Sequence, residues 1–310
     1  MADRILVVGE LNVDLIVSGL PYFPMLGREV VASGLDLVLG SSSAICAAGL
    51  TRLGAGVDFV GKVGKDYYGD FVVAQLRQLG VGTTHVIQDP SEHTGVTISL
   101  TFSFDRALIT HMGCIPILRL EDIQLSILRN YRHLHVGAYF LQRKLRPGLL
   151  DLFRQAHVAG LTVSLDTGCD PDGKWDSELL EVLRQVDIFF PNEDEARSIA
   201  RAQDTETALG KLSARARLVV VKRGANGATS MSGGQIIQSP GFRVNVVDTT
   251  GAGDSFDAGF ILARVVRGMP VEESLRFANA CGALCVTGYG GTAAQPTLEQ
   301  VQNFLKGRPA

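Results

Sequence analysis

The sequence predicts an α/β fold in which helices flank a central, mainly parallel sheet and a small second sheet stands off it. Three observations predict this fold. Short β-branched runs alternate along the chain with helical stretches. The segment Val96–Phe104 instead alternates apolar and polar residues, as a strand with one exposed face does. Finally, 310 residues are enough for one large domain with a substantial core, so we expect a single domain over residues 1–310.

Six short apolar runs have the composition of strands that are buried on both faces, as in a parallel sheet. They are Ile5–Val8, Val57–Val60, Leu134–Val136, Thr162–Leu165, Val186–Phe190 and Leu218–Val221. The helical stretches between them are Ala44–Leu53, Tyr67–Leu79, Pro147–Val158, Ser177–Leu183 and Asp194–Ala200. Such alternation places helices on both faces of the sheet, and sheets of this kind bind ligands beyond the carboxyl ends of their strands.

The small sheet is predicted from inserted segments at about 12–39 and 94–113. Its expected strands are Asn12–Val17, Glu29–Leu39, Val96–Phe104 and Ala107–Met112. The pair Asp105-Arg106 turns the chain between the last two of these strands. We expect this sheet to act as a lid over the site, and an ordinary edge hairpin is the alternative.

Composition excludes several classes of protein. The formal net charge is −3, so no basic excess points to nucleic acid. No apolar run approaches the ~20 residues of a transmembrane helix, so we expect no membrane association. The five cysteines are scattered and form no C-x-x-C motif, which is typical of a reduced, cytoplasmic protein.

The stretch Asp248–Phe256, D-T-T-G-A-G-D-S-F, has the pattern of an anion site. We expect it to follow a strand, Val244–Val247, and to open a helix. A Gly-Ala-Gly turn at a helix start leaves backbone N–H groups free for an anion, and the helix dipole adds positive charge there. A carboxylate at Asp254 makes sense as a base beside a phosphoryl group, although it could simply be a first-turn helix residue.

This stretch resembles the C-terminal signature of the ribokinase (PfkB) family of carbohydrate kinases. Residues 9–14, 40–54 and 191–195 resemble three further elements of the family in the expected order. The resemblance covers essentially the whole chain. It implies a ribokinase-like three-layer fold with a β lid. It also implies a Mg²⁺-dependent enzyme that transfers the γ-phosphate of ATP to a primary hydroxyl of a monosaccharide, as ribokinase and fructokinase do.

The resemblance also implies roles for individual residues. Asp254 would accept the proton of the hydroxyl, while the backbone of Gly251, Ala252 and Gly253 would stabilise the phosphoryl charge. The sugar would contact a set of residues from three segments: Asn12, Asp14, Gly40, Ser41 and Tyr139, together with Asp254. Ser41 and Ile45 stand where the family usually has glycine and asparagine, and this departure puts ribose itself in doubt.

The nucleotide and the metal would be bound mainly by the second half of the chain. The expected nucleotide contacts are Asn192, Lys222, Gly224, Gly227, Gly251, Gly253 and Asn279. Mg²⁺ would be held by Glu195, Asn192 and Asp166, mostly through water. Asp248 and Thr250 could hold K⁺. The alternatives are ordinary ones: helix-start residues at 192 and 195, a buried helical amide at 279 and a turn cap at 248.

The acceptor stays open at this point. Aromatic residues at Tyr139 and Phe140 would suit a nucleoside, and Arg106 could bind a 2-keto-3-deoxy sugar acid or a phosphate, although a turn arginine is often simply solvated. A non-catalytic sugar or nucleotide sensor on the same fold is a third possibility. The edges of the lid sheet could pair between subunits, which would make a homodimer.

Overall fold

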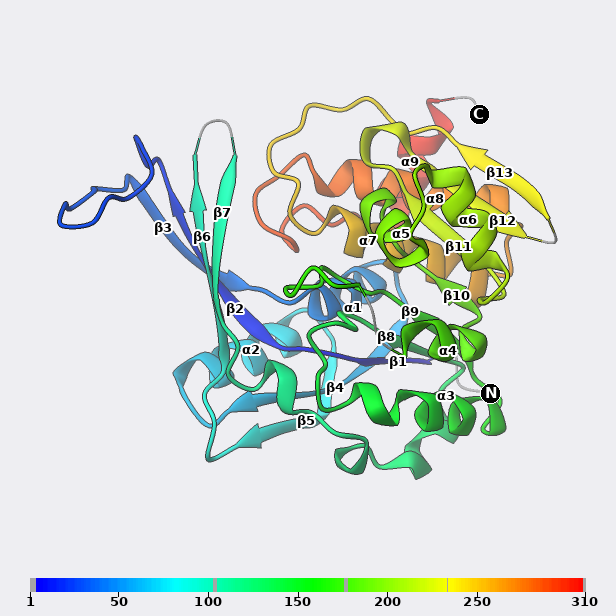
Figure 1. Cartoon of the computed structure of the whole chain (residues 1–310). Coiled ribbons are helices and arrows are strands. Elements are labelled where there is room, and N and C mark those ends of the chain that lie inside the picture. The colour runs from blue at the N-terminus through cyan, green and yellow to red at the C-terminus, as the bar shows by residue number, and fades with distance from the viewer. Residues whose placement is uncertain (1–3, 103–104, 176–177, 233, 309–310) are drawn as a thin grey trace.

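The computed structural model describes residues 4–102, 105–175, 178–232 and 234–308. Nine strands form one large sheet in the order β13-β12-β11-β10-β9-β8-β1-β4-β5 (Figure 1). Neighbours are parallel from β11 to β5, while β12 and β13 are antiparallel additions at one edge. From one edge to the other the strands are Gln235–Ser239, Ala228–Ser232, Val219–Lys222, Ile188–Phe189, Thr162–Leu165, His133–Val136, Arg4–Val8, Gly56–Gly64 and Gly82–Asp89.

Helices cover both faces of this sheet. The helices α1 to α9 are Ser42–Arg52, Tyr67–Gln78, Leu149–Val158, Leu179–Val182, Glu193–Ala200, Thr205–Ser213, Ala252–Ile261, Val271–Cys285 and Leu298–Lys306. Short 3₁₀ turns lie at Ile115–Ile117, Leu120–Asp122, Leu125–Asn130, Arg146–Gly148, Leu183–Gln185 and Gly224–Asn226, and a π-helical turn at Leu262–Val266 follows α7.

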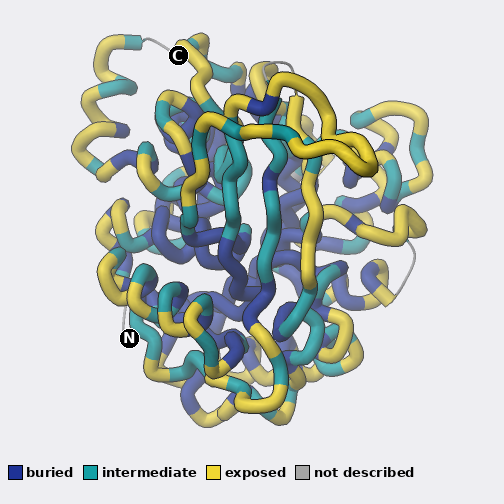
Figure 2. Tube along the Cα trace, turned by 90° about the vertical axis from the view of Figure 1, so that its left-hand side faces the viewer, coloured by how far each residue is buried: buried dark blue, intermediate teal, exposed yellow. Residues whose placement is uncertain are grey.

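The apolar core is divided by the sheet because successive residues of a strand point to opposite faces. In β1, Ile5 and Val7 pack with α1, α2, α7 and α8, whereas Leu6 and Val8 pack with α3, α4, α5 and α6. Figure 2 shows the buried residues concentrated in this main body.

The small sheet has the strand order β3-β2-β6-β7, with bounds Gly34–Leu39, Asn12–Ser18, Gly95–Thr101 and Arg106–His111. It stands off the main body beside α1 and α2 (Figure 1). The strand β2 follows β1 directly, so the small sheet starts at the carboxyl edge of the large one.

The predicted fold class is confirmed: the large sheet is mostly parallel, helices flank it, and a small separate sheet is present. The predicted strand Val244–Val247 is wrong. This segment is irregular, and Val246 and Val247 are exposed. After Ser239 the chain leaves the sheet, and Val247 N bonds to the carbonyl of Val286, the C-cap of α8, at 2.8 Å and not to a strand.

Smaller differences concern boundaries and omissions. The predicted strand Glu29–Leu39 is regular only over Gly34–Leu39. Residues 103 and 104, expected in a strand, and residue 177, expected in a helix, lie outside the described residues. The hairpin of β12 and β13 was missed because its residues are mostly polar and carry no buried-strand pattern. None of the helices in the described ranges is long and apolar enough to cross a membrane.

Candidate active site

The expected anion loop lies at the start of α7. Gly251 is the N-cap and has a left-handed backbone with φ of 76°. A Cβ atom there would lie 2.7 Å from the backbone of Gly291, so both the conformation and the close approach require glycine. The first N–H groups of α7 follow at Ala252, Gly253 and Asp254, and such groups have no partner within the helix. This geometry is suited to an anion.

A buried ammonium group lies beneath the first turn of α7. Lys222, the last residue of β11, places Nζ 2.5 Å from Oδ2 of Asp166 and 3.0 Å from Oδ2 of Asp257. Asp166 follows β9, and Asp257 lies on α7 three residues after Asp254. The other oxygen of Asp257, Oδ1, is buried without a hydrogen-bond partner. Three elements that are distant in sequence thus share one charge cluster.

This cluster controls the ionisation of Asp254. Burial raises the pKa of Asp254 well above its usual range, and the negative charge of Asp166 adds to this effect, while Lys222 opposes it. Burial would also raise the pKa of Asp166, but the adjacent Lys222 ammonium lowers it below the usual value. A carboxylate with a raised pKa is a stronger proton acceptor, which suits a general base.

Asn192 and Glu195 cap α5. The Asn192 side chain accepts a hydrogen bond from Glu195 N at 2.9 Å, and Glu195 Oε2 accepts one from Asn192 N at 2.8 Å. Burial and the charge of Asp166 raise the pKa of Glu195 to about 7. Glu195 therefore belongs electrostatically to the same cluster, although the capping alone explains its conformation.

The expected sugar-binding residues at 12, 14 and 40 are brought together. Asn12 Nδ2 donates to Asp14 Oδ1 at 2.9 Å, and both side chains lie against Gly40. A Cβ atom on Gly40 would lie 2.3 Å from Asp14 Oδ1 and 2.4 Å from Asn12 Nδ2, so a larger residue there would displace this pair. Burial raises the pKa of Asp14 to about 6, against the bond from Asn12 and the charge of Arg106.

Ser41 serves α1 as its N-cap. Its hydroxyl accepts a hydrogen bond from Ala44 N at 2.9 Å and donates to the carbonyl of Glu10 at 2.6 Å, and its backbone has φ of 72°. The carboxylate of Glu10 accepts bonds from Ser42 Oγ at 2.9 Å and from Ser43 N at 3.1 Å. Sequence reasoning missed Glu10; its signal was a carboxylate directly after a buried strand.

Arg106, at the start of β7, reaches from the small sheet to the anion loop. Its Nη1 donates to Thr250 Oγ1 at 2.5 Å. The charge of Arg106 also opposes the raised pKa of Asp14 and contributes to the lowered pKa of Asp248. The arginine therefore has a specific partner in the site.

Asp248 organises the loop before α7. Its Oδ1 accepts bonds from Thr250 N at 2.9 Å and Thr250 Oγ1 at 2.8 Å, and its Oδ2 accepts one from Gly290 N at 2.9 Å. Burial alone would raise the pKa of Asp248, but these bonds lower it. The carboxylate thus joins the anion loop to the loop around Gly290.

Tyr139 does not fit its expected role. Only 1% of its surface is exposed, and its ring packs edge-on against Phe140 and beneath the guanidinium of Arg146. This burial in the core argues against the expected contact with an acceptor. The cause is the aromatic run itself, because two adjacent large rings are most stable when both leave water.

The expected nucleotide residues fall into two groups. Asn279 Nδ2 donates to the carbonyls of Ser239 and Pro240, at 3.1 and 3.2 Å, so its donor group ties α8 to the end of β13. Gly227 packs against the same turn, where a Cβ atom would lie 2.1 Å from Ser239 O. Gly224, with φ of 53°, borders open space instead. Within the described ranges, no three His, Cys, Asp or Glu side chains are arranged to hold a metal directly.

Comparison with known proteins identifies the family. The model of the pfkB family carbohydrate kinases matches residues 3–298. Among curated proteins, the chain is 28% identical to the ribokinase of Bacillus subtilis, over 97% of this chain and 99% of the relative. It is 31% identical to the ATP-dependent ribose-1-phosphate kinase of Halopiger xanaduensis, over 98% and 99%. The probable fructokinase-4 of Arabidopsis thaliana is 28% identical over 89% and 90%.

Solved structures agree. Arabidopsis thaliana ribokinase, complexed with ribose and ATP, superposes with a TM-score of 0.84 at 28% identity and covers 99% of both chains. A candidate ribokinase II from E. coli, in complex with ATP and Mg²⁺, gives a TM-score of 0.87 at 25% identity, with 99% and 100% coverage. The chain belongs to the pfkB family of carbohydrate kinases. It is therefore an enzyme, a phosphotransferase with an alcohol group as acceptor.

Proposed function

We propose that this enzyme transfers the γ-phosphate of ATP to a primary hydroxyl of a monosaccharide, with Asp254 as the general base. The observation that carries the proposal is the position of Asp254. Its carboxyl lies half-buried in the first turn of α7, directly after the Gly251–Gly253 loop, and burial raises its pKa.

Each group in the site has a defined task in this reaction. Asn12 and Asp14 orient the sugar by accepting and donating hydrogen bonds. Asp254 takes the proton as the hydroxyl oxygen bonds to the γ-phosphorus and ADP leaves. The N–H groups from Gly251 to Gly253 stabilise the charge on the phosphoryl oxygens.

Mg²⁺, when bound, would neutralise part of the phosphate charge. Asp166, Asn192 and Glu195 are oxygen donors of the kind that Mg²⁺ prefers. Their oxygens already accept protein hydrogen bonds, so we expect contact through water. K⁺ at Asp248 and Thr250 stays a prediction, because the bonds from Thr250 and Gly290 explain this carboxylate without a cation.

The first test is Asp254→Asn. The amide cannot accept the proton, so we expect turnover to fall by about 10²–10⁴ while ATP binding is kept. Turnover and nucleotide affinity are measured on a panel of sugars, sugar acids and nucleosides. Asp151→Asn, on the exposed face of α3, is the matched control and keeps native turnover.

Two results would contradict this proposal. Native turnover in Asp254→Asn would exclude the base, and no acceptor-dependent ADP release by the native enzyme across the panel would favour a sensor. The main argument for a nucleoside acceptor was an aromatic surface at Tyr139, and this residue is buried in the core.

A second candidate acceptor is a sugar that carries an acidic group. The bond from Arg106 to Thr250 holds a guanidinium between Asp14 and the anion loop, where it could pair with a carboxylate or phosphate of the acceptor. Two relatives have names that point the same way, the ribose-1-phosphate kinase above and the 5-dehydro-2-deoxygluconokinase of Geobacillus thermodenitrificans.

The variant Arg106→Met separates the two acceptor classes. If the acceptor is acidic, kcat/KM falls by about tenfold or more for sugar acids or sugar phosphates, because a charge-assisted hydrogen bond is lost, and changes little for neutral sugars. An equal loss for both classes would mean that Arg106 acts on the phosphoryl group or on closure of the small sheet. Arg129→Met, on the exposed turn before β8, is the control.

A further inference from the structure

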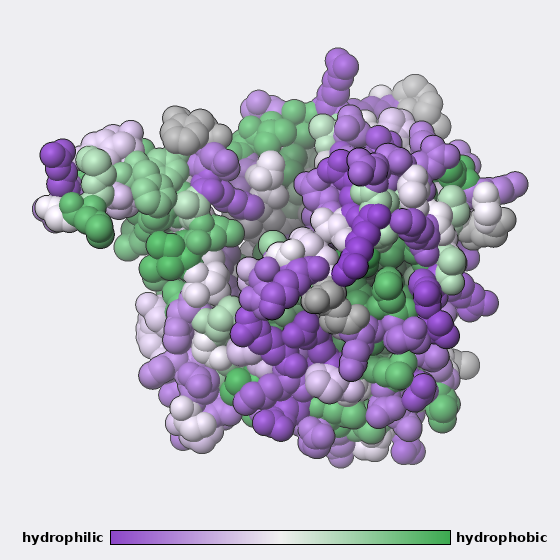
Figure 3. Space-filling model, in the orientation of Figure 1, coloured by the Kyte–Doolittle hydropathy of each residue, from purple (hydrophilic) through white to green (hydrophobic). Residues whose placement is uncertain are grey.

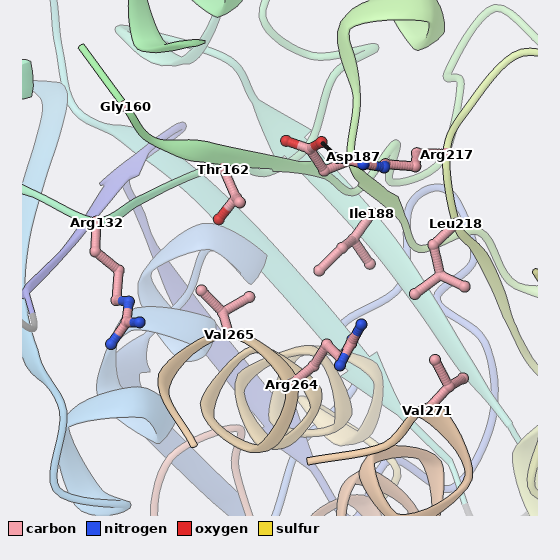
Figure 4. A pocket seen from close by; sticks show the side chains of 10 residues that line it. All are labelled: Arg132, Gly160, Thr162, Asp187, Ile188, Arg217, Leu218, Arg264, Val265 and Val271. Carbon is pink, nitrogen blue, oxygen red and sulfur yellow. Dashed lines mark hydrogen bonds and ion pairs between the residues drawn. The ribbon is translucent and has the colours of Figure 1, made fainter. Parts of the chain in front are cut away.

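A cavity of about 780 Å³ lies at the edge of the large sheet opposite the catalytic residues. It opens between the amino ends of β9, β10 and β11 and the region where α7 gives way to α8 (Figure 4). Its lining comprises Arg132, Gly160, Thr162, Asp187, Ile188, Arg217, Leu218, Arg264, Val265 and Val271. The site residues at 166, 192 and 222 lie at the other ends of the same strands. The cavity therefore cannot be part of the catalytic centre.

The lining combines positive charge with an apolar wall. It contains three arginines and one carboxylate, Asp187, whose Oδ1 lies 3.5 Å from Nη1 of Arg217. Arg264 uses Nη1 to bond the carbonyl of Met269 at 3.0 Å, which leaves most of its guanidinium donors for another group. In Figure 4, Thr162 and Ile188 point from the strand ends toward Val265. Guanidinium groups beside aliphatic side chains suit a small organic anion.

Arg264 and Val265 occupy the π-helical turn Leu262–Val266. Such turns are rare and occur frequently at functional sites. Here the turn presents an arginine and a valine together at the floor of the cavity.

A buried hydrogen-bond chain leads from this cavity along one face of the sheet. Thr162 Oγ1 lies 2.7 Å from Nδ1 of His133, whose Nε2 lies 2.8 Å from Ser164 Oγ. Ser164 Oγ also lies 2.8 Å from Nδ1 of His135. His133, His135 and Ser164 are at most 1% exposed. The next residue on the same face of β9 is Asp166, the partner of Lys222.

The hydrogen bonds of this chain can be arranged in two ways in which every donor has an acceptor. A hydroxyl has one proton to donate, and a neutral imidazole has one donor and one acceptor nitrogen. If Thr162 accepts from His133, then Ser164 donates to His133 and accepts from His135, so both rings carry the proton on Nδ1. If Thr162 donates to His133, every bond reverses and both rings carry it on Nε2. Reversal takes up one proton at one end and releases one at the other, with no change in charge.

We propose that the cavity binds a small organic anion with a phosphate or carboxylate head, and that this anion sets the direction of the Thr162–His133–Ser164–His135 chain. A carboxylate or a doubly deprotonated phosphate head can only accept hydrogen bonds, so it accepts one from the hydroxyl of Thr162. Thr162 must then accept from His133, and both histidines are held in the Nδ1-protonated form. Occupation of the cavity is thereby transmitted to His135, at the far end of the chain.

Binding is tested by calorimetry with phenyl phosphate, benzoate and benzyl alcohol on three proteins: the native enzyme, Arg264→Met and Arg184→Met. Arg184 is a surface arginine that pairs with Glu181 and does not line the cavity. We expect either anion to bind the native enzyme and Arg184→Met equally, and Arg264→Met about tenfold more weakly, which is the loss of one charge-assisted bond. The stronger anion identifies the head group.

Three results of the calorimetry would overturn the proposal. They are no binding of either anion to the native enzyme, equal binding to all three proteins, which would place the anion in the catalytic loop, and binding of benzyl alcohol as tight as that of phenyl phosphate. Unfolding temperatures and turnover without added anion show whether each variant is folded.

The coupling is tested by the ring ¹⁵N chemical shifts of the histidines, which report the tautomer directly. In the native enzyme we expect the bound anion to move His133 and His135 to the Nδ1-protonated form. Thr162→Val removes the hydroxyl but keeps the shape and the strand preference, so the anion should bind while His135 does not respond. An unchanged His135 in the anion-bound native enzyme, or an equal response in Thr162→Val, would refute the coupling.

Discussion

Lys222 is one ammonium group among four carboxyl groups, those of Asp166, Asp257, Glu195 and Asp254. The charge of a buried lysine is costly without partners, and here the carboxylates raise the pKa of Lys222 well above its usual value although burial alone would lower it. The lysine therefore stays charged, and it sets the electrostatic potential in which Asp254 works.

This position predicts a change in the pH profile of Lys222→Met. A general base must be deprotonated, so kcat/KM rises with pH through the pKa of Asp254. Lys222 lowers that pKa, so its removal moves the acid limb to higher pH. The profile of kcat/KM is compared with that of Lys211→Met, a surface control whose Nζ bonds backbone carbonyls of α5 and its cap. A limb that stays in place or moves to lower pH contradicts the assignment.

The same residue shows where sequence reasoning stops. The motif Asp248–Phe256 predicted the anion loop and the helix start because those features are local. The pairing of Lys222 with Asp257 was not predicted, since it depends on how β11 and α7 pack. Tyr139 failed for a related reason: an aromatic residue near a strand end can line a pocket or fill the core, and only packing decides.

At the scale of elements, β8 carries two buried histidines in the middle of the sheet. Burial lowers the pKa of His133 to about 3 and that of His135 to about 4. Both values lie below about 6.5, the usual value that applies in the unfolded chain. As pH falls below about 6.5, these two histidines become protonated in the unfolded chain but stay neutral in the folded protein. The free energy of unfolding therefore decreases as the solution becomes more acidic.

We therefore expect the free energy of unfolding to decrease by up to about 1.4 kcal/mol per pH unit for each of the two histidines between about pH 6 and pH 4. His133→Gln removes one titrating ring, so its free energy of unfolding should fall by up to about 1.4 kcal/mol per pH unit less than that of the native enzyme in that range, whatever its absolute stability. Urea unfolding at several pH values measures the slope. His111→Gln, on the exposed strand β7, keeps the native slope, and a native slope in His133→Gln would contradict this account.

Sequence reasoning predicted the strands that are buried on both faces of the large sheet. The strands from β1 to β11 that lie inside the large sheet had continuous apolar sequences, and most of them appear where expected. The edge hairpin of β12 and β13 escaped because it has no continuous apolar run: the buried residues Thr229 and Ser230 of β12 are polar. The segment 244–247 looked like a strand because its valines are β-branched, but it pairs with no strand, and Val247 N bonds to the carbonyl of Val286 at the end of α8.

At the scale of the whole molecule, the small sheet has two unlike faces. Asn12, Asp14 and Thr97 lie on the face toward the site, and the opposite face carries aliphatic residues of all four strands. Figure 3 shows hydrophobic residues gathered over this sheet and hydrophilic ones over much of the main body. Leu35 and Ile109 on that aliphatic face are 68% and 57% exposed. Such a patch is typical of an interface.

We predict that the enzyme dimerises through this aliphatic face. Ile109→Lys should shift the protein toward monomers, as measured by sedimentation, because a buried unpaired charge is costly at an interface. Leu108→Lys is the control: it is the adjacent residue of β7, equally exposed at 57%, but it points to the opposite face. A native protein that is already monomeric, or equal effects of the two variants, would exclude this interface.

Bare backbone at Gly40 fixes the floor beneath Asn12 and Asp14, since no larger residue could occupy that position without pushing the pair apart. We therefore expect acceptor preference to be changed more readily at neighbouring positions, such as Ser41 and Ile45. An attempt to change the preferred sugar should therefore keep Gly40 and substitute the residues around it.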